Sequence, residues 1–439
     1  MLSLAPAALQ RIQDKLSCRG ANPCARDADR AVALVRMGIA ESFLRTLLTP
    51  LIVTAYTGVN CLGEGVDAWW SALRSRGSGL RACAFEDAAL ETFVGQVDGV
   101  ERVRLRAELA WFDCRNNRLA QLGLEQDGFA DAVSAARARY GPHRIAVVLG
   151  TSTSGVGATE HAYRHRDPVT GALPAGFHYI ETQNTFSLAA FVRRTLDLGG
   201  VAHVVSTACS SSAKVFASAA RLIDSGLADA ALVGGVDSLC LTTLYGFRSL
   251  DLLSREPCRP YDAERTGISI GEGAGFALLE RKGEGVAFVG VGESADAYHM
   301  STPHPEGLGA RLAMERALAS ASVAPEEIGY VNLHGTATRT NDAAEGRAVR
   351  DVFGSRTPCS ATKGAHGHLL GAAGITEAIV AIMSLERGWL PGTANTRALD
   401  LACGCHVLLQ GEPAGARYVL SNSFGFGGNN CSLVFGRTP

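Results

Sequence analysis

The chain has 439 residues, of which 47% are hydrophobic, and its formal net charge is −2. A chain of this length exceeds one ordinary hydrophobic core, so we expect two domains or one duplicated unit. The near-zero charge leaves no basic footprint for nucleic acid, and we expect no nucleic-acid partner.

The twelve cysteines lie at irregular spacing without a CxxC pair, which favours reduced thiols and a cytoplasmic enzyme. Cys403, Cys405 and His406 have a metal-like composition, but no fourth ligand has suitable spacing, so we expect no metal. The N-terminus has no signal-peptide pattern. The uncharged run 46–63 is interrupted by Pro50 and glycine, so a buried strand is favoured over a membrane span.

Residues 1–50 contain two helical stretches and are predicted to form an N-terminal helical extension of unknown function. Beyond it, the pattern alternates between apolar strands and amphipathic helices. The elements expected up to residue 200 are a strand from Leu51, helices over 65–74, 101–140 and 183–198, and a strand over 143–150. This alternation predicts α/β layers with a mostly buried sheet.

The next stretch, 201–235, predicts a strand, a sharp turn, a buried helix and a second strand, with Cys209 in the turn. A helix N-terminus favours negative charge, so this position is expected to lower the pKa of the thiol and favour its nucleophilic thiolate. The alternative is that Cys209 is only a packed core cysteine.

In the remaining chain, strands are expected over 275–279, 287–292, 328–333 and 359–362, a helix over 307–320, and a strand, glycine turn and strand over 419–435. The glycine-rich GEGAG at 271–275 lacks a GKS or GKT ending and is not a phosphate loop. His334 and Lys363 directly follow two of these strands. Ligands of open α/β sheets bind at such strand ends, so we expect these side chains in a site.

The ordered segments STACSSS at 206–212, HGTAT at 334–338, KGAHGHLLGAAG at 363–374 and NSFGFGG at 422–428 closely resemble the β-ketoacyl synthases of type II fatty acid and polyketide synthesis. The resemblance covers about 51–435. It implies an α/β thiolase-like layered fold of two similar halves, namely 51–297 with the nucleophile and 298–437 with the histidine and lysine residues.

The resemblance assigns site residues one by one. Cys209 matches the acyl-accepting nucleophile, His334 the first histidine and Lys363 the lysine. The second histidine falls five positions after the lysine, which selects His368 rather than its neighbour, and Glu377 matches the acidic partner of the lysine.

Four further residues match substrate contacts. Phe426 corresponds to the gate of the acyl pocket and lies beside Phe424, whereas Thr336 and Thr338 correspond to contacts with the pantetheine arm. The N–H groups of Cys209 and Phe426 are expected to hold a tetrahedral oxyanion.

The implied reaction joins an acyl group on Cys209 to malonyl-acyl-carrier protein, with loss of CO2, to give 3-oxoacyl-acyl-carrier protein in fatty acid biosynthesis. The alternatives are a ketosynthase of a polyketide or aryl-polyene pathway and a non-catalytic chain-length partner subunit. No cofactor is expected, because acyl carrier protein delivers the substrates on its phosphopantetheine.

The resemblance also implies a homodimer, with a heterodimer with a related subunit as the alternative. Acyl carrier protein is acidic, and Arg74, Arg76, Arg248 and Arg255 are the candidates for a basic docking rim. Because of two departures from the family pattern, the resemblance implies the basic reaction but no particular substrate preference: Asn341 stands where a glycine is usual, and Gly364 and His366 alter the loop between lysine and histidine.

Overall fold

The computed structural model describes residues 48–438. The expected helical extension therefore lies, up to residue 47, outside the described part. No helix among the described residues is long and apolar enough to cross a membrane.

One half of the large sheet contains the nucleophile segment. Its strands, in spatial order, are β6 (Ala202–Val205), β5 (Ile145–Gly150), β7 (Ala230–Asp237), β9 (Gly273–Glu280) and β1 (Leu51–Asn60). Strands β6, β5 and β7 are parallel, whereas β9 runs antiparallel to both β7 and β1. Because β5, β6 and β7 are parallel, their carboxyl ends lie at the same edge of the sheet.

The other half repeats this arrangement. Its strands, in the corresponding order, are β12 (Pro358–Ser360), β11 (Ile328–Asn332), β16 (Tyr418–Gly425), β17 (Asn429–Arg437) and β10 (Val286–Ala295), with β14 (His406–Val407) beyond β12. The parallel and antiparallel pairings follow the same sequence, and β1 pairs with β10 to join the halves. The expected duplicated α/β architecture is confirmed.

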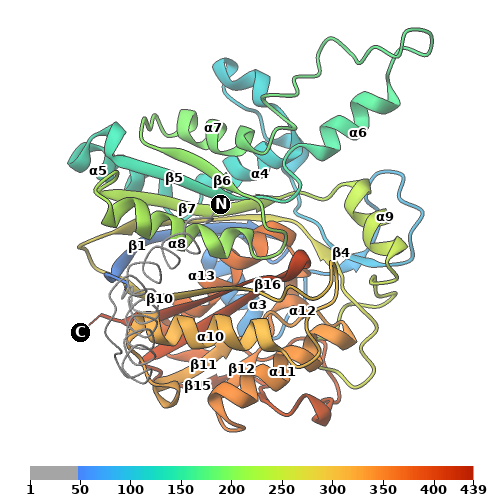
Figure 1. Cartoon of the computed structure of the whole chain (residues 1–439). Helices are drawn as coiled ribbons and strands as arrows, with labels where there is room; N and C mark the ends of the chain where they lie inside the picture. Colours follow the sequence, from blue (N-terminus) through green and yellow to red (C-terminus); the bar gives the residue numbers. More distant parts are fainter. Residues whose placement is uncertain (1–47, 439) are drawn as a thin grey trace, which may run out of the picture. The chain divides into compact units, whose positions relative to one another are not determined.

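Helices form three layers around the two halves of the sheet (Figure 1). The inner layer holds α8 (Ser211–Asp224) and α13 (Ala373–Arg387). The outer helices are α4 (Arg115–Leu124), α5 (Phe129–Tyr140) and α7 (Phe186–Thr195) on one side, and α10 (Leu308–Ala321) and α11 (Arg339–Phe353) on the other. The resulting order is helix, sheet, helix, sheet, helix.

Shorter elements connect these layers. The helices are α3 (Val66–Arg74), α6 (Val156–Arg164), α9 (Leu241–Ser249) and α12 (Lys363–His366); the strands are β2 (Gly63–Glu64), β3 (Arg81–Ala82), β4 (Phe93–Gly95), β8 (Ile270–Gly271), β13 (Trp389–Leu390) and β15 (Glu412–Pro413). The 3-10 turns are η1 (Val100–Arg102), η2 (Ala107–Phe112), η3 (Pro142–Arg144), η4 (Pro325–Glu327), η5 (Leu370–Ala372), η6 (Leu401–Cys403) and η7 (Phe426–Gly428).

The region 101–140 is helical, as expected, but it is divided into several separate elements. The segment forms 3-10 turns and then two α-helices. The α-helices α4 and α5 are separate because Asp127 and Gly128 adopt positive φ angles of 54° and 67° that an α-helix cannot continue through.

Small residues allow the inner helices to approach each other and the sheet closely. A Cβ added to Gly374 of α13 would lie 2.4 Å from the backbone nitrogen of Ala213 in α8. A Cβ on Gly150 of β5 would lie 2.5 Å from the nitrogen of Ser212. The small-residue composition of α8 is therefore required by packing, and its fully exposed positions, such as Arg221, lie in its last turn.

We predict that Gly374→Val lowers the free energy of unfolding by about 2 kcal/mol or more, because the added side chain overlaps backbone atoms of α8. Urea denaturation measures the change. The matched control is Gly246→Ala in α9, where an added Cβ meets no atom within 4 Å and the higher helix propensity of alanine should slightly stabilise the protein. Equal stability of Gly374→Val and the wild type would contradict the close approach of the helices.

Candidate active site

Cys209 lies in the turn between β6 and α8, directly before the first residues of the helix. The preceding residue, Ala208, has a φ of 53°, in the left-handed region that non-glycine residues rarely adopt. Ser152, which follows the end of β5, donates a hydrogen bond from its Oγ to the carbonyl oxygen of Ala208 at 3.2 Å. The chain is thus held in a sharp elbow that presents the thiol at the N-terminal end of α8.

His368 lies opposite this thiol, with its Nε2 2.9 Å from the Sγ of Cys209. The backbone N–H of Leu370 donates to the Nδ1 of His368 at 3.2 Å, so Nδ1 carries no proton. Burial and the nearby charge of Lys363 lower the pKa of His368 well below its usual value. His368 is therefore a neutral imidazole whose Nε2–H points to the sulfur.

His334 is oriented in a similar way by a different donor. The ammonium group of Lys363 lies 3.2 Å from the Nδ1 of His334 and can only donate, so the proton of this imidazole is also on Nε2. Burial and Lys363 lower the pKa of His334 well below its usual value. The His334 and His368 rings are nearly perpendicular, at 85°, with centroids 5.4 Å apart.

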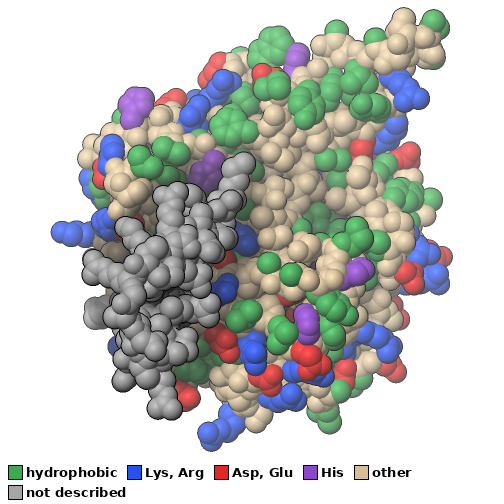
Figure 2. Space-filling view, viewed as in Figure 1, with side chains coloured by type: hydrophobic (Ala, Val, Ile, Leu, Met, Phe, Trp, Pro, Cys, Tyr) green, Lys and Arg blue, Asp and Glu red, His purple; other side chains and the backbone are tan. Residues whose placement is uncertain are grey.

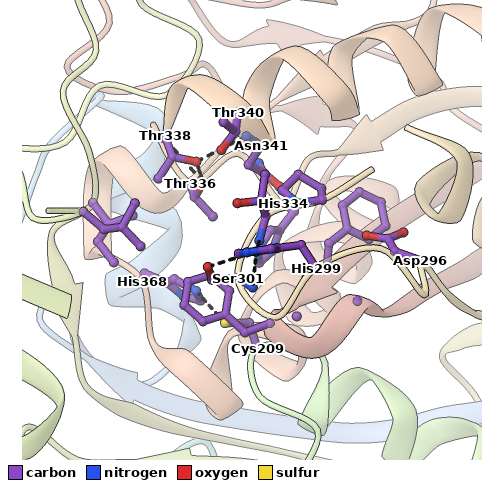
Figure 3. A pocket seen from close by; sticks show the side chains of 18 of the residues that line it. Cys209, Asp296, His299, Ser301, His334, Thr336, Thr338, Thr340, Asn341 and His368 are labelled. Carbon is purple, nitrogen blue, oxygen red and sulfur yellow. Dashed lines mark hydrogen bonds between the residues drawn. The ribbon is translucent and has the colours of Figure 1, made fainter. Parts of the chain in front are cut away.

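The structure brings the three predicted catalytic side chains together in one pocket (Figure 3). One ligand-type atom from each of Cys209, His334 and His368 lies within 4.8 Å of the others. Such a trio could suit a soft metal ion, but the two imidazoles direct N–H groups rather than lone pairs to the centre. The donor set fits an oxygen anion better than a cation.

Lys363 and Glu377 form a buried ion pair behind the histidines. The ammonium group of Lys363 also donates to the carbonyl oxygen of His334, and it thereby fixes both the ring and the backbone of this residue. Burial raises the pKa of Glu377 to about 7, although the contact with Lys363 opposes this shift. The predicted pairing of Glu377 with the lysine is present in the structure.

The turn between Lys363 and His368 is held from outside through its carbonyl groups. Ser78 and Asn395 donate to the carbonyl oxygen of Gly364 at 2.9 and 2.6 Å, and the thiol of Cys258 contacts the carbonyl oxygen of Lys363 at 3.2 Å. These contacts fix the separation of the lysine and the histidine.

The two unusual residues of this turn have structural explanations. A Cβ on Gly364 would lie 2.3 Å from the carbonyl oxygen of Ala394, so the position is closely packed. His366 is buried and points to Gly367 and Thr362, at 2.8 Å from the carbonyl oxygen and 3.1 Å from the hydroxyl, and it does not line the pocket.

The pocket above Cys209 has a volume of about 60 Å³ and is lined by the predicted substrate-contact residues Thr336, Thr338, Phe424 and Phe426. The hydroxyls of Thr336 and Thr338 lie 2.9 Å apart. The ring of Phe426 packs against Phe247, with centroids 5.6 Å apart. This volume holds only a few water-sized groups, and the gating role of Phe426 stays a prediction.

The expected lowering of the Cys209 pKa is wrong. Burial raises the pKa of the thiol to about 12, whereas the charge of Lys363 and the backbone N–H of Phe426 oppose this shift. The loss of water contact outweighs the favourable helix end, because the side chain is only 5% exposed. The N–H of Phe426 nevertheless lies beside the sulfur, where an oxyanion contact was predicted.

Two buried acids that support the site were not identified from the sequence. Glu345 of α11 accepts the backbone N–H groups of His334 and Gly335 at 2.7 and 2.8 Å. Asp237 ends β7 and accepts several N–H and hydroxyl groups near the nucleophile. The sequence contained a signal for each of these acids. Asp237 directly follows the apolar run 230–236, and Glu345 follows Asp342 at a spacing that places both on one helix face.

None of the four arginines proposed for carrier docking lines the pocket. Arg248 follows the pocket residue Phe247 in α9 and pairs with Asp251 at 3.1 Å. Arg74 packs over the ring of Trp389, which does not line the pocket. Basic and acidic side chains of the described residues lie interspersed on the face shown in Figure 2.

The matched halves of the sheet and the two inner helices define a thiolase-like protein. The family model for "Beta-ketoacyl synthase, N-terminal domain" matches residues 49–285, and that for "Beta-ketoacyl synthase, C-terminal domain" matches 286–397. The chain belongs to the β-ketoacyl synthase family of condensing enzymes.

Relatives and solved structures agree with this membership. The chain is 31% identical to 3-oxoacyl-[acyl-carrier-protein] synthase 2 of Vibrio cholerae, over 88% of this chain and 99% of that protein. It is 39% identical to the chloroplastic 3-oxoacyl-[acyl-carrier-protein] synthase II of Arabidopsis thaliana over 55% of this chain, but the match spans only 48% of that protein.

Among solved structures, the chain is similar to one described as a ketosynthase (ApeO) in complex with its chain length factor (ApeC) from Xenorhabdus doucetiae. The TM-score is 0.82 and the identity 40%, over 89% of this chain and 98% of the other. A β-ketoacyl synthase from Burkholderia phymatum gives a TM-score of 0.79 at 28% identity, over 89% of this chain and all of the other.

We predict that Lys363→Met slows alkylation of Cys209 by iodoacetamide at pH 8 by a factor on the order of ten. Loss of the positive charge raises the pKa of the thiol further and reduces its thiolate fraction. Peptide mass mapping after timed labelling measures the rate. The matched control is Lys214→Met in α8, since Lys214 pairs with Glu293 and should leave the rate unchanged. An unaltered rate in Lys363→Met would show that this lysine does not act on the thiol.

Proposed function

We propose that the protein condenses an acyl group with malonyl-acyl-carrier protein in two stages. In the first, the sulfur of Cys209 attacks an acyl-carrier thioester, an S–acyl bond forms, and the carrier thiol leaves with the proton. In the second, the malonyl group loses CO2, and the resulting carbanion attacks the carbonyl carbon of acyl-Cys209. The new C–C bond forms as the C–S bond breaks, the 3-oxoacyl-carrier product is released, and the sulfur of Cys209 leaves as a thiolate that takes up a proton from water.

The observation that supports this proposal is that His334 and His368 both have their proton on Nε2 and each place a ring nitrogen within 4.8 Å of the sulfur of Cys209. Decarboxylation leaves negative charge on the thioester oxygen of the malonyl unit, and fixed donors in a buried site stabilise such charge most effectively. His334 and His368 supply these donors as neutral imidazoles, because Lys363 and the N–H of Leu370 occupy their other ring nitrogens. Their depressed pKa values keep them uncharged above pH 6.5.

The first stage uses a different group of donors. Because the pKa of Cys209 is about 12, the thiol predominates at neutral pH and its proton must leave as the bond to the acyl carbon forms. The charge of Lys363 and the N-terminus of α8 favour the developing thiolate. The backbone N–H groups of Cys209 and Phe426 would hold the tetrahedral oxyanion.

We propose acyl carrier protein as the partner that delivers both substrates, since Thr336 and Thr338 line the pocket where a phosphopantetheine arm would pass. A neighbouring structure, at 22% identity, is described as a type II polyketide acyl-carrier protein in complex with its ketosynthase. No cofactor and no metal ion take part in this scheme, and the location remains predicted as cytoplasmic.

The strand β6 forms an edge of the large sheet where a second chain can pair to form a dimer. Within the described residues, β6 is the terminal strand of the sheet, and Val201 beside it is exposed. Unpaired edges of this kind are commonly covered by another strand. We propose a homodimer, or a heterodimer with a related chain, that pairs at this edge.

Fatty acid biosynthesis is the first candidate pathway, supported by the full-length likeness to the Vibrio cholerae synthase. The second candidate is a polyketide or aryl-polyene ketosynthase that works beside a chain-length subunit. It is favoured by the 40% identity to a structure containing a ketosynthase and its chain length factor. The complete set of Cys209, His334, Lys363 and His368 argues against a non-catalytic partner role for this chain.

Intact-mass measurement tests the proposal. The purified protein is incubated with saturated, polyenoyl and aryl acyl-carrier thioesters, and then with malonyl-carrier. We expect acyl transfer to Cys209 and a product that is two carbons longer, with saturated chains indicating fatty acid synthesis and polyenoyl or aryl chains the second candidate. Cys209→Ala is the control and should accept no acyl group. Normal elongation by Cys209→Ala, or no acylation of the wild type by any donor, would contradict the proposal.

A further inference from the structure

The carboxylate of Asp237 is fully buried at the end of β7, and its partners come from two different parts of the active site. The Oδ1 atom accepts the hydroxyl of Thr151 at 2.6 Å and the N–H and hydroxyl of Thr153, each at 2.9 Å. The N–H of Ser152 lies at 2.9 and 3.0 Å from the two oxygens. The N–H of Gly371 completes the set, at 2.6 Å from Oδ2.

The first set of partners leads to the nucleophile. Ser152 donates its N–H to Asp237 and its hydroxyl to the carbonyl oxygen of Ala208, at 3.2 Å. Ala208 has the left-handed φ of 53° that forms the elbow before Cys209. Such a conformation persists only when surrounding contacts hold it. Asp237 thus stabilises the elbow through one intervening residue.

The second partner leads to the histidine. Gly371 directly follows Leu370, which has a left-handed φ of 51° and whose N–H orients the ring of His368. The carboxylate and Gly371 are in close contact, since a Cβ on Gly371 would lie 2.8 Å from Oδ2. The same carboxylate therefore also holds the turn that fixes the tautomer of His368.

We propose that Asp237 is a positioning residue that sets the distance between Cys209 and His368 by holding the turn beside each of them. The two side chains belong to different halves of the fold, and Asp237 is bonded to segments from both. This inference rests on the proposed condensation, because the second stage needs His368 close to acyl-Cys209.

The charge of Asp237 and the hydrogen bonds of Asp237 have opposite effects on the reaction. A carboxylate near the thiol raises the pKa of Cys209, so removal of the charge alone should make the thiol more reactive. Loss of positioning should instead slow condensation. The two effects have opposite signs and can be measured separately on one variant.

The test is Asp237→Asn, which keeps the shape but places an amide N–H group against backbone N–H donors. We expect kcat for condensation to fall at least about tenfold, since small misplacements of reacting groups are costly. The KM for malonyl-carrier should stay within about twofold, because no substrate contact is removed. Alkylation of Cys209 by iodoacetamide at pH 8 should be at least as fast as in the wild type.

The matched control is Asp262→Asn. Asp262 is equally buried and accepts backbone N–H groups from Glu264, Arg397 and Ala398, at 2.9, 2.8 and 3.2 Å, without contact to either turn. The Asp262→Asn variant should be less stable than the wild type, but its folded molecules should have the wild-type kcat. If Asp237→Asn behaves in the same way, its role is structural only and the inference is overturned.

A second variant covers the case in which Asp237→Asn does not fold. Ser152→Ala removes only the bond to Ala208, and the side chain is exposed, so folding should be unaffected. We expect slower acyl transfer to Cys209 at unchanged thermal stability, and an unchanged transfer rate would overturn the inference. If the wild type does not condense, the proposed function is overturned, and this inference with it. If the wild type and both variants are fully active, only the inference is overturned.

Discussion

The buried ammonium group of Lys363 is the interaction on which the rest of the site depends. It contacts Glu377 and both the ring and the backbone of His334, and Lys363, Glu377 and His334 are all almost completely buried. Buried ion pairs rarely add stability, because desolvation of the charges is costly. The pair is instead explained by its effect on the imidazole. An ammonium group can only donate, so it excludes the tautomer of His334 that would turn a lone pair toward Cys209.

The duplicated architecture explains how the reacting groups meet. Cys209 lies just before α8, the inner helix of the first half, and His368 lies shortly before α13, the inner helix of the second half. The two helices pack together because Gly374 and Ala213 are small, so the segments before them converge on one pocket. The packing of the core and the geometry of the site thus depend on the same contact between α8 and α13. Neither half contains the site on its own.

Local sequence patterns were sufficient to predict the main strands of the sheet, the inner helix α8 and the elbow around Cys209, since apolar runs and glycine stops report directly on local structure. These patterns failed where a property of a residue depends on residues that are distant in the sequence. The pKa of Cys209 was misjudged because a helix end is visible in the sequence but full burial is not. Asp237 was missed because its partners lie up to 134 positions away in the chain, as with Gly371. The break in 101–140 was instead overlooked, although the Asp127–Gly128 dipeptide that adopts the positive φ angles is a typical turn signal in the sequence.

The central claim is that His334 and His368 are neutral donors whose Nε2–H groups face Cys209. Nitrogen NMR of protein labelled with 15N-histidine tests this most directly, with His334→Gln and His368→Gln variants to assign the two signals. Both rings are expected to be uncharged at pH 7 and protonated at Nε2. A positively charged ring, or a proton on Nδ1 of either histidine, would contradict it.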